Sequence, residues 1–518
     1  MSINKKIIAF AAAIMICAGA VCSCDNSGKT VSNEERELDY WIQLSGAAAL
    51  LVDNLGKTPL YQQLQEDTGI KINFIHPSGG SISEKFNILI ASTDLPDIIT
   101  YNWLTYPGGP QKAIDEGVII DINQYADKAP NLIGYLKEHS DVKKLAETDE
   151  GSLFSFPFIR GDESLCVSWG LTLRKDWLDD LGLEVPETID EWETVLRAFK
   201  EKKNAAAPLT ITTGAFENSQ FVGAFDTTMG YYIDDGKVKY GMLEPGFKDF
   251  LVLMNKWYNE GLLDANFALL DNTTIDSNIL NGASGAAGLS LGNGIGRYLS
   301  MAPDDKFDLV GAPSPVKNKG DYPEFGYLQT AVPPMTGAFT VICADSEKKD
   351  IALELLDYGY SEQGHMLYNF GIEGDSYEMV DGYPKYTDKI TNNSEGQSMN
   401  TMLSQYTTAY SSGPCVQDKR YMEQYASLPQ QLDAWDTWTK TNMKEHVLPN
   451  LYVTSDEQNE LATLDNAINT TAEEYITKFI IGTKSFDEYD SAISDLKARG
   501  IERALEIRNK AYQKYLSK

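Results

Sequence analysis

The sequence predicts an α/β protein with two lobes, and three observations lead to this fold class. Short apolar segments typical of strands alternate along the chain with amphipathic helical segments. The chain has 518 residues, which is too long for one small core. Hydrophobic residues make up 42% and charged residues 23% of it, a globular rather than a disordered composition.

The first predicted elements follow apolar runs and the turn residues that flank them. Strands are expected over Leu38–Leu44, Ile70–Phe74 and Ile98–Tyr101. Helices are expected from Pro59 to Gly69 and over Ser83–Ala91, because proline suits a first helical turn and glycine suits a helix end.

Later elements continue the alternation of strands and helices. Strands are predicted over Leu171–Leu173, Leu209–Thr212, Ala286–Leu291 and Phe339–Ala344. A short helix is predicted over Lys175–Leu181. Thr188 and Glu191 have the spacing of a capping box, which predicts a helix start. In the helix that follows, one buried stripe is expected at Trp192, Val195, Leu196 and Phe199.

The C-terminal part, from about Leu461 onward, is predicted to be mostly helical. Ser485 and Glu488 form another possible capping box, and Gly500 is expected to end that helix. No fixed-period repeat is evident, so a solenoid or a propeller is disfavoured.

The first residues have the layout of an export signal. Lys5 and Lys6 precede the apolar run Ile7–Ala20, which is too short for a comfortable membrane span. Val21-Cys22-Ser23 before Cys24 resembles a bacterial lipobox, so we expect acylation of Cys24 after removal of residues 1–23. Residues 24–37 are polar and predict a lipid-anchored tether. An ordinary signal peptide cut nearby is the alternative, and it would still export the chain.

Composition narrows the classes of partner. The net charge of −31 disfavours nucleic acid and anionic lipid as ligands. The four histidines form no HExxH motif, and with no CxxC motif and no DxDxDG loop we predict no metal and no cofactor, with a bound calcium ion as the alternative left open. Cys166, Cys343 and Cys415 are expected to be three separate buried thiols, although one pair could form a disulfide.

Motifs for enzymatic chemistry are weak. Gly288-Leu289-Ser290-Leu291-Gly292 matches the letters of a nucleophile elbow, but Ser290 falls inside a predicted strand with a glycine-rich loop after it. The segment Gly292–Gly296 fails the dinucleotide-binding spacing because position 297 is arginine. A glycosidase needs only two placed carboxylates, and the 75 acidic residues do not single out a pair.

The order of several motifs resembles the extracellular solute-binding proteins of ABC importers, the family that includes maltodextrin-binding proteins. The motifs are Tyr61–Ile72, Leu95-Pro96-Asp97-Ile98-Ile99, Arg174–Leu178 with Thr188–Trp192, and Ala338–Ala344. Asn369–Gly374 and Phe479–Gly482 are similar to a long lipoprotein subgroup of LplA type, often assigned to oligosaccharide uptake, aldouronates included.

The resemblance implies a type II periplasmic-binding-protein-like fold, with ligand held in a cleft between two lobes joined by hinge strands. Lobe 1 is expected over 38–156 plus about 335–385, and lobe 2 over 157–334 plus about 386–518. The expected crossings lie near Phe154–Arg160, Gly311–Met335 and Gly371–Thr387. Gly and Pro residues within 311–334 suit a hinge, although a surface loop would look the same.

Candidate ligand residues follow the predicted strands, where loops present aromatic platforms for sugar rings and polar groups for hydroxyls. They are Gln43, Ser45, Tyr101, Asn102, Trp103, Trp169, Arg174, Phe216, Glu217, Asn293, Tyr327 and Glu373. Core packing is the alternative for Tyr101, a cap for Ser45 and a structural salt bridge for Arg174. Trp435 and Trp438 could either pack or cover the cleft.

The function that follows is capture of an oligosaccharide and its delivery to an ABC permease, without catalysis. The ATPase would be a separate chain, and the expected state is a monomer on the extracytoplasmic face of the cell membrane of a Gram-positive bacterium. Alternatives are a surface glycoside hydrolase, a sensor or adhesin, and a binding protein for peptides.

Overall fold

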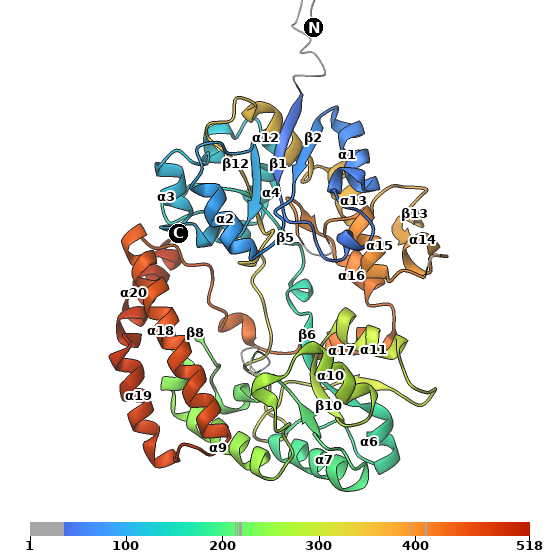
Figure 1. The fold of residues 1–518 in the computed structure, drawn as a ribbon, viewed down its shortest axis with the longest axis vertical. Helices are drawn as coiled ribbons and strands as arrows, with labels where there is room; N and C mark the ends of the chain where they lie inside the picture. The colour runs from blue at the N-terminus through green and yellow to red at the C-terminus, as the bar shows by residue number, and fades with distance from the viewer. Residues whose placement is uncertain (1–35, 213, 215, 217–219, 395, 410–411) are drawn as a thin grey trace, which may run out of the picture.

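The computed structural model describes residues 36–212, 214, 216, 220–394, 396–409 and 412–518. The predicted signal and Cys24 lie outside these residues. Two lobes form an α/β fold, as predicted, one around a five-stranded sheet and the other around a four-stranded sheet (Figure 1). We call them lobe 1 and lobe 2. The division of the sequence between them at the expected boundaries stays a prediction.

Fifteen strands and nineteen helices are described. The strands are β1 (Glu37–Trp41), β2 (Lys71–Ile75), β3 (Ile98–Tyr101), β4 (Phe156–Pro157), β5 (Ile159–Arg160), β6 (Trp169–Arg174), β7 (Leu209–Thr210), β8 (Tyr231–Asp234), β9 (Lys237–Tyr240), β10 (Ala286–Ser290), β11 (Leu309–Gly311), β12 (Phe339–Ile342), β13 (Tyr377–Val380), β14 (Tyr383–Tyr386) and β15 (Val416–Gln417). The helices are α1 (Pro59–Thr68), α2 (Ile82–Ile90), α3 (Gly109–Asp115), α4 (Pro130–Glu138), α5 (Ser140–Ala146), α6 (Lys175–Leu181), α7 (Ile189–Lys202), α9 (Pro245–Asn259), α10 (Asn272–Leu280), α11 (Arg297–Ser300), α12 (Lys349–Tyr358), α13 (Glu362–Phe370), α14 (Asp388–Thr391), α15 (Met399–Tyr406), α16 (Lys419–Tyr425), α17 (Pro429–Trp438), α18 (Ser455–Ile480), α19 (Tyr489–Ala498) and α20 (Ile501–Ser517).

The sheet of lobe 1 has the order β2-β1-β3-β12-β4. β1 pairs in parallel with β2 and β3, and β12 runs antiparallel to β3. The carboxyl ends of β1, β2 and β3 therefore meet at one edge of the sheet, which faces lobe 2 in Figure 1. All four residues of β3 are buried. The hydroxyl of Thr100 lies 2.8 Å from the hydroxyl of Tyr40 on β1 and 2.7 Å from the hydroxyl of Thr340 on β12.

The sheet of lobe 2 has the order β11-β6-β10-β7. β7 and β10 are parallel, whereas β6 is antiparallel to both β10 and β11. α7 packs against this sheet through the predicted stripe, because Trp192, Val195, Leu196 and Phe199 are all buried. Its N-terminus carries the predicted capping box between Thr188 and Glu191.

Most predicted elements are confirmed, with shifts at their ends. β3 and α6 have the predicted bounds, but β1 ends at Trp41 rather than at residue 44. The prediction for the segment after Ser290 was wrong. Leu291–Gly296 forms a π-helical turn that leads into α11, where we expected a loop. Ser290 itself ends β10, as a strand residue.

Two segments join the sheets, one between Pro157 and Trp169 and the other between Gly311 and Phe339. The chain returns to lobe 1 again later, because Ala409, Cys415 and Tyr452 pack into the same core as β1 and β3. Residues of the range 386–518 therefore contribute to both cores.

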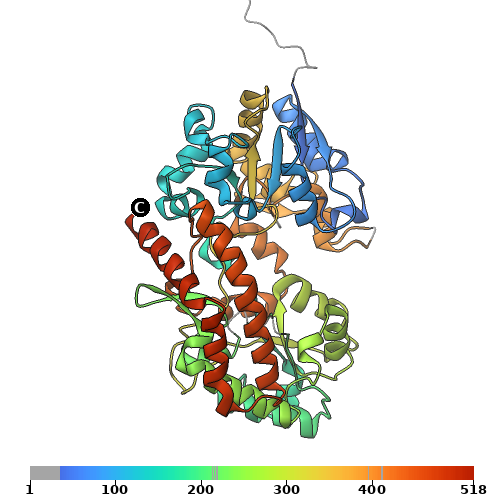
Figure 2. The same cartoon turned by 60° about the vertical axis from the view of Figure 1, so that its left-hand side comes forward.

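The last three helices cross from lobe 2 to lobe 1 along one side of the molecule (Figure 2). α18 packs in the core of lobe 2 and its first residue, Ser455, donates a hydrogen bond to the carbonyl of Gly108 in lobe 1 (3.3 Å). At the end of α20, Lys514 and Lys518 form ion pairs with the buried Asp149 of lobe 1 at 3.4 and 3.2 Å. We call these helices the C-terminal arm. The predicted capping box of Ser485 and Glu488 precedes α19.

Three further observations concern the described part of the chain alone. None of its helices is both long and apolar enough to cross a membrane. Within the same ranges, His, Cys, Asp and Glu residues form no group of three that could hold a metal ion. Cys166, Cys343 and Cys415 are free and buried, which confirms the prediction of three separate thiols.

Candidate functional site

Two adjoining cavities lie where the carboxyl ends of the strands of lobe 2 face lobe 1. One of about 480 Å³ is lined by lobe 2, and one of about 410 Å³ lies between the lobes. Both are lined by Ser290 and Asn293, so they are continuous along this edge. We call the pair the cleft. Ligands of α/β proteins bind at such strand ends, where the chain leaves the sheet and loops present side chains.

Strand directions explain why this edge carries polar and aromatic groups. β7 and β10 are parallel, so Ile211 and Thr212 after β7 and Leu291 after β10 emerge side by side. β6 runs the other way, and its first residue, Trp169, pairs with Ser290 at the end of β10. The tryptophan is thereby brought to the same edge from a different part of the sequence.

The Trp169 ring can lie close to the sheet because residue 288 has no side chain. A Cβ atom at Gly288 would stand 2.3 Å from the ring, which is closer than real Cβ contacts. The ring of Tyr327, from the segment that joins the sheets, is tilted by 55° to that of Trp169, with centroids 6.4 Å apart. Burial raises the pKa of Tyr327 and keeps its hydroxyl protonated at neutral pH. Trp169 is half-buried and offers an aromatic face to the cavity.

A polar cluster forms the opposite wall of the lobe 2 cavity. Arg297 of α11 holds the carboxylate of Asp276 with both terminal nitrogens, with Nη1 to Oδ2 at 2.8 Å. Tyr298 donates its hydroxyl to the same carboxylate at 2.7 Å. The hydrogen bonds from Arg297, opposed by partial burial, lower the pKa of Asp276. The Nε of Arg297 donates to the carbonyl of Asn293 at 2.9 Å.

The inter-lobe cavity is closed by a helix from elsewhere in the chain. Tyr421 and Tyr425 of α16 stack with centroids 5.7 Å apart, and both line the cavity. Tyr425 lies directly over Gly292, where a Cβ atom would be 2.1 Å from its hydroxyl oxygen. Ser45 of lobe 1 and Asn400 of α15 supply a hydroxyl and an amide to the same space.

Three predicted ligand residues line the cleft, namely Ser45, Trp169 and Asn293, and Tyr327 packs beside them. The backbone amide of Ala48 donates to the hydroxyl of Ser45 at 3.1 Å, so the predicted cap is also present. Gln43 is exposed on the loop before Ser45.

Other predicted residues lie in the cores or in structural contacts. Tyr101, Trp103 and Phe216 are buried, and Trp103 is 0% exposed, so it presents no face to a ligand. Its ring packs at right angles on Phe86, because the turn after β3 folds back over α2. Core packing was the alternative for Tyr101, and its ring stacks on Phe86 at 4.1 Å.

The predicted polar residues outside the cleft have local partners. Asn102 caps the turn after β3 and donates to the carbonyl of Pro334 at 3.2 Å. Arg174 forms the structural ion pair given as its alternative, with Asp176 at 2.6 Å. Glu373 is exposed, and Glu217 lies outside the described residues.

Trp435 and Trp438 pack rather than cover the cleft, since both are buried and donate to backbone carbonyls of Ser164 and Leu171.

Several lining residues were missed by sequence reasoning: Thr210, Asp276, Ser290, Arg297, Asn400, Tyr421 and Tyr425. Tyr421 and Tyr425 are four residues apart on one helix, and this spacing could have marked an aromatic face. The others have no local signal, because only the packing of distant segments brings them together.

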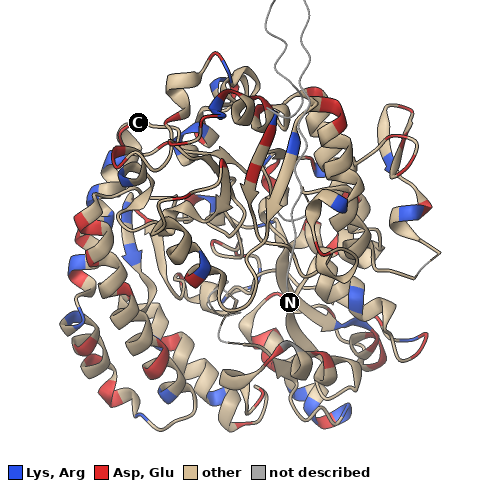
Figure 3. Cartoon of the chain, turned by 45° about the horizontal axis from the view of Figure 1, so that its top comes forward, with Lys and Arg blue, Asp and Glu red and all other residues tan. Residues whose placement is uncertain are grey.

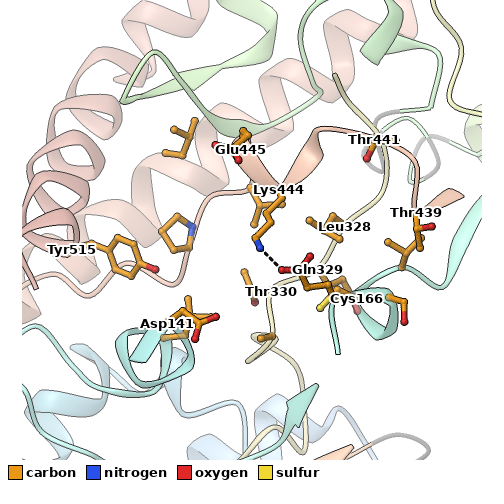
Figure 4. A pocket seen from close by; sticks show the side chains of 18 of the residues that line it. Asp141, Cys166, Leu328, Gln329, Thr330, Thr439, Thr441, Lys444, Glu445 and Tyr515 are labelled. Atoms are coloured by element: carbon orange, nitrogen blue, oxygen red, sulfur yellow. Dashed lines mark hydrogen bonds and ion pairs between the residues drawn. The ribbon is translucent and has the colours of Figure 1, made fainter. Parts of the chain in front are cut away.

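A third cavity, of about 530 Å³, lies on the other face of the segments that join the lobes. Ser168 and Trp169 line the cleft, whereas their neighbours Cys166 and Val167 line this hinge-side cavity. Figure 4 shows Asp141 and Tyr515 on one side of it and Cys166 and Thr439 on the other. None of the predicted ligand residues lines it, so the cleft is the candidate site.

The fold and the cleft define a class, that of two-lobed binding proteins that hold a ligand between their lobes. The family model "Bacterial extracellular solute-binding protein" matches residues 52–366, and the chain belongs to this family.

Lipoprotein LipO of Bacillus subtilis (strain 168) is 24% identical over 529 residues, covering 98% of each chain. The fructooligosaccharide ABC transporter substrate-binding protein FusA of Streptococcus pneumoniae is 31% identical over 223 residues, 40% of this chain and 41% of FusA. The polygalacturonan/rhamnogalacturonan-binding protein YtcQ of Bacillus subtilis is 25% identical over 301 residues, 56% of this chain and 57% of YtcQ.

The solved structure of FusA in complex with kestose has the same fold. It superposes with a TM-score of 0.74 at 21% identity, over 93% of this chain and 99% of FusA.

Proposed function

We propose that this protein captures an oligosaccharide outside the cytoplasm and delivers it to an ABC permease. The observation that carries the proposal is the cleft, in which Trp169 and the pair Tyr421 and Tyr425 stand among hydroxyl and amide groups. Aromatic faces stack on the C–H faces of sugar rings, and short polar side chains bond their hydroxyls. FusA and YtcQ are named for binding saccharides, which supports the same ligand class here.

Binding without turnover is part of the proposal. Glycosidases place two carboxyl groups on either side of the scissile bond. Among the described residues that line the cleft, Asp276 is the one carboxylate, and Arg297 and Tyr298 occupy it. No histidine stands beside Ser290 in that same lining, so the serine has no base there. This arrangement supports a receptor rather than a hydrolase.

Delivery would depend on movement of the lobes. Two segments join the sheets, and the cleft contains residues from both lobes, so bound ligand would hold the lobes together. The closed shape would then be what a membrane permease recognises. The proposed monomer presents one such cleft for each anchored chain.

We propose Cys24 as the anchor, on the basis of the lipobox-like sequence and the likeness to lipoprotein LipO. In a Gram-positive host, the Cys24→Ala variant should move from the membrane fraction to the medium, whereas the native chain should incorporate radiolabelled palmitate. An unlabelled native chain that still pellets with membranes would contradict lipid anchoring.

Calorimetric titration tests the proposed ligand class. The mature chain would be titrated with oligosaccharides derived from xylan, arabinan, fructan, pectin and starch, and the recovered ligand would be analysed for cleavage. We expect micromolar binding of at least one series, with intact ligand afterwards. Trp169→Ala should weaken it by about tenfold or more, which is about 1.4 kcal/mol.

Tyr322→Ala is a matched control, because Tyr322 is an aromatic residue that is 55% exposed and outside the cleft lining. It should leave the affinity unchanged. Cleaved ligand would favour a hydrolase. Binding of peptides and of no saccharide would overturn the proposal.

A further inference from the structure

The cleft is electrically balanced within a strongly acidic protein. The chain has a net charge of −31, and its acidic and basic residues spread over the outer helices, including the C-terminal arm (Figure 3). Among the described residues that line the cleft, by contrast, only Asp276 and Arg297 are charged, and they neutralise each other. The inter-lobe cavity has no charged lining residue in the described ranges.

We propose that the cleft selects neutral oligosaccharides and discriminates against those that carry uronate groups. This inference rests on the proposed function and concerns the chemical class of the saccharide. A cleft with this preference would differ from that of a receptor for uronate-containing saccharides, a ligand class that the family resemblance alone leaves open.

Arg297 is the one cation in the described wall of the cleft, and the fork of its two terminal nitrogens is occupied by Asp276. Recognition of a carboxylate by arginine relies on the fork of two parallel N–H groups. Both terminal nitrogens of Arg297 face Asp276, and Nε donates to the carbonyl of Asn293. A uronate at this wall would have to displace Asp276 or lie beside its negative charge, and either loses affinity.

Three other arginines near the site do not offer a free fork to the cleft, and one of them, Arg420 of α16, holds Asp418. Arg174 lies at the far end of β6 from Trp169, is 8% exposed, and uses its fork on Asp176. Arg160 of β5 has no ion pair with any carboxylate in the described ranges, and its Nε and Nη1 are buried without a partner. It lies close to Cys166 and Tyr327 and does not line the cleft. Binding of a uronate carboxylate by Arg160 is therefore the interaction that would contradict the proposed preference.

Neutral ligands should bind through stacking and hydroxyl bonds alone. Asp276 retains lone pairs for a sugar hydroxyl, since its Oδ2 accepts one hydrogen bond, from Nη1 of Arg297. Ser45, Asn293 and Asn400 add uncharged donors and acceptors. Affinity for a neutral ligand should thus be insensitive to ionic strength, because no net charge is brought together.

The experiment compares pairs of oligosaccharides with the same number of sugar units, one neutral and one carrying uronate groups. Trigalacturonate and the galactotriose made from it by reduction of its carboxyl groups form one pair. Xylotetraose and xylotriose bearing a methylglucuronosyl branch form another. Each is titrated into the mature chain at 0.05 M and 0.5 M NaCl. We expect the neutral member of any bound pair to bind at least about tenfold more tightly, with equal affinity at both salt concentrations.

One variant should gain affinity for the uronate ligands. Asp276→Asn removes the charge that occupies Arg297, so affinity for the uronate member should rise at least about tenfold and should fall again with added salt. Asp179→Asn is the matched control. Asp179 pairs with Lys175 on the exposed face of α6, and it should leave both affinities unchanged.

Two results would overturn the inference. One is tighter binding of the uronate member by the native chain, and loss of that preference in Arg160→Gln would then identify Arg160 as its cause. The other is an Asp276→Asn variant that folds with native circular dichroism and gains no uronate affinity. Failure of every saccharide to bind would instead refute the proposed function, and the two failures are therefore distinguishable.

Discussion

The position of Trp169 depends on the absence of a methyl group at residue 288. In Gly288→Ala the new Cβ would lie 2.3 Å from the indole, whereas ordinary contacts begin at 3.4 Å. The ring would have to move by about 1 Å or more, and overpacking of this kind costs about 1–3 kcal/mol. The displaced ring would also leave the cavity wall, so ligand affinity should fall with stability.

Gly134→Ala supplies the same methyl group with the opposite expectation. Gly134 lies inside α4, and a Cβ atom there would have no neighbour within 4 Å. Alanine in a helix interior is more stable than glycine by about 0.5–1 kcal/mol. The two variants therefore add the same methyl group to a helix position with open space and to a strand position with none.

Urea denaturation followed by circular dichroism measures both effects. We expect a lower midpoint for Gly288→Ala, a higher midpoint for Gly134→Ala, and weaker saccharide binding in the first variant alone. Equal midpoints for the native chain and Gly288→Ala, with unchanged affinity, would refute the account of how Trp169 is held.

Two further predictions concern buried carboxylates. Burial raises the pKa of Asp418, but hydrogen bonds from His365 and Arg420 outweigh it and lower the pKa well below its usual value of about 3.9. A lowered folded pKa stabilises the protein above the unfolded pKa, so this stability should be lost as pH falls below about 4. The urea midpoints of the native chain and Asp418→Asn should converge between pH 7 and pH 3, and a constant gap would contradict the assignment. Asp357 accepts backbone hydrogen bonds from Asn131 and Leu132 at the start of α4, at 3.1 and 2.9 Å. Asp357→Ala leaves the buried backbone amide of Leu132 without its acceptor and should cost about 1–3 kcal/mol in denaturant unfolding, whereas no loss would mean that water replaces the carboxylate.

Local sequence predicted the elements whose causes are local. β3 is a continuous apolar run and α6 lies between a strand and a glycine, and both have the predicted bounds. The capping box at Thr188 is a contact within four residues and was likewise predictable. β1 ended early because its neighbour β2 pairs only as far as Ile75, a fact that its own sequence does not contain.

Residues of the cleft were predictable from the sequence only where a position at the end of a strand is enough to place a side chain there. Trp169 and Asn293 follow from their places at the ends of strands. Trp103 has the same local setting but turns into the core, and only the packing of α2 decides between these outcomes. The glycines after Ser290 became a helical turn because Tyr425 and Gln431 pack against Gly292 and Gly296 from far along the chain.

The C-terminal arm sets the mechanics of the molecule. α18 spans 26 residues, which at a rise of about 1.5 Å per residue gives a stiff rod of about 39 Å. It is fixed in the core of lobe 2 and attached to lobe 1 at Gly108, while Lys514 and Lys518 fasten α20 to Asp149. Along this side of the molecule, α18 and the two ion pairs fix the distance between the lobes. The displacement of one lobe relative to the other should therefore grow with distance from the C-terminal arm. Probes placed on α5 and α20 should report little change when ligand binds, and probes placed on α2 and α10 should report the full amplitude.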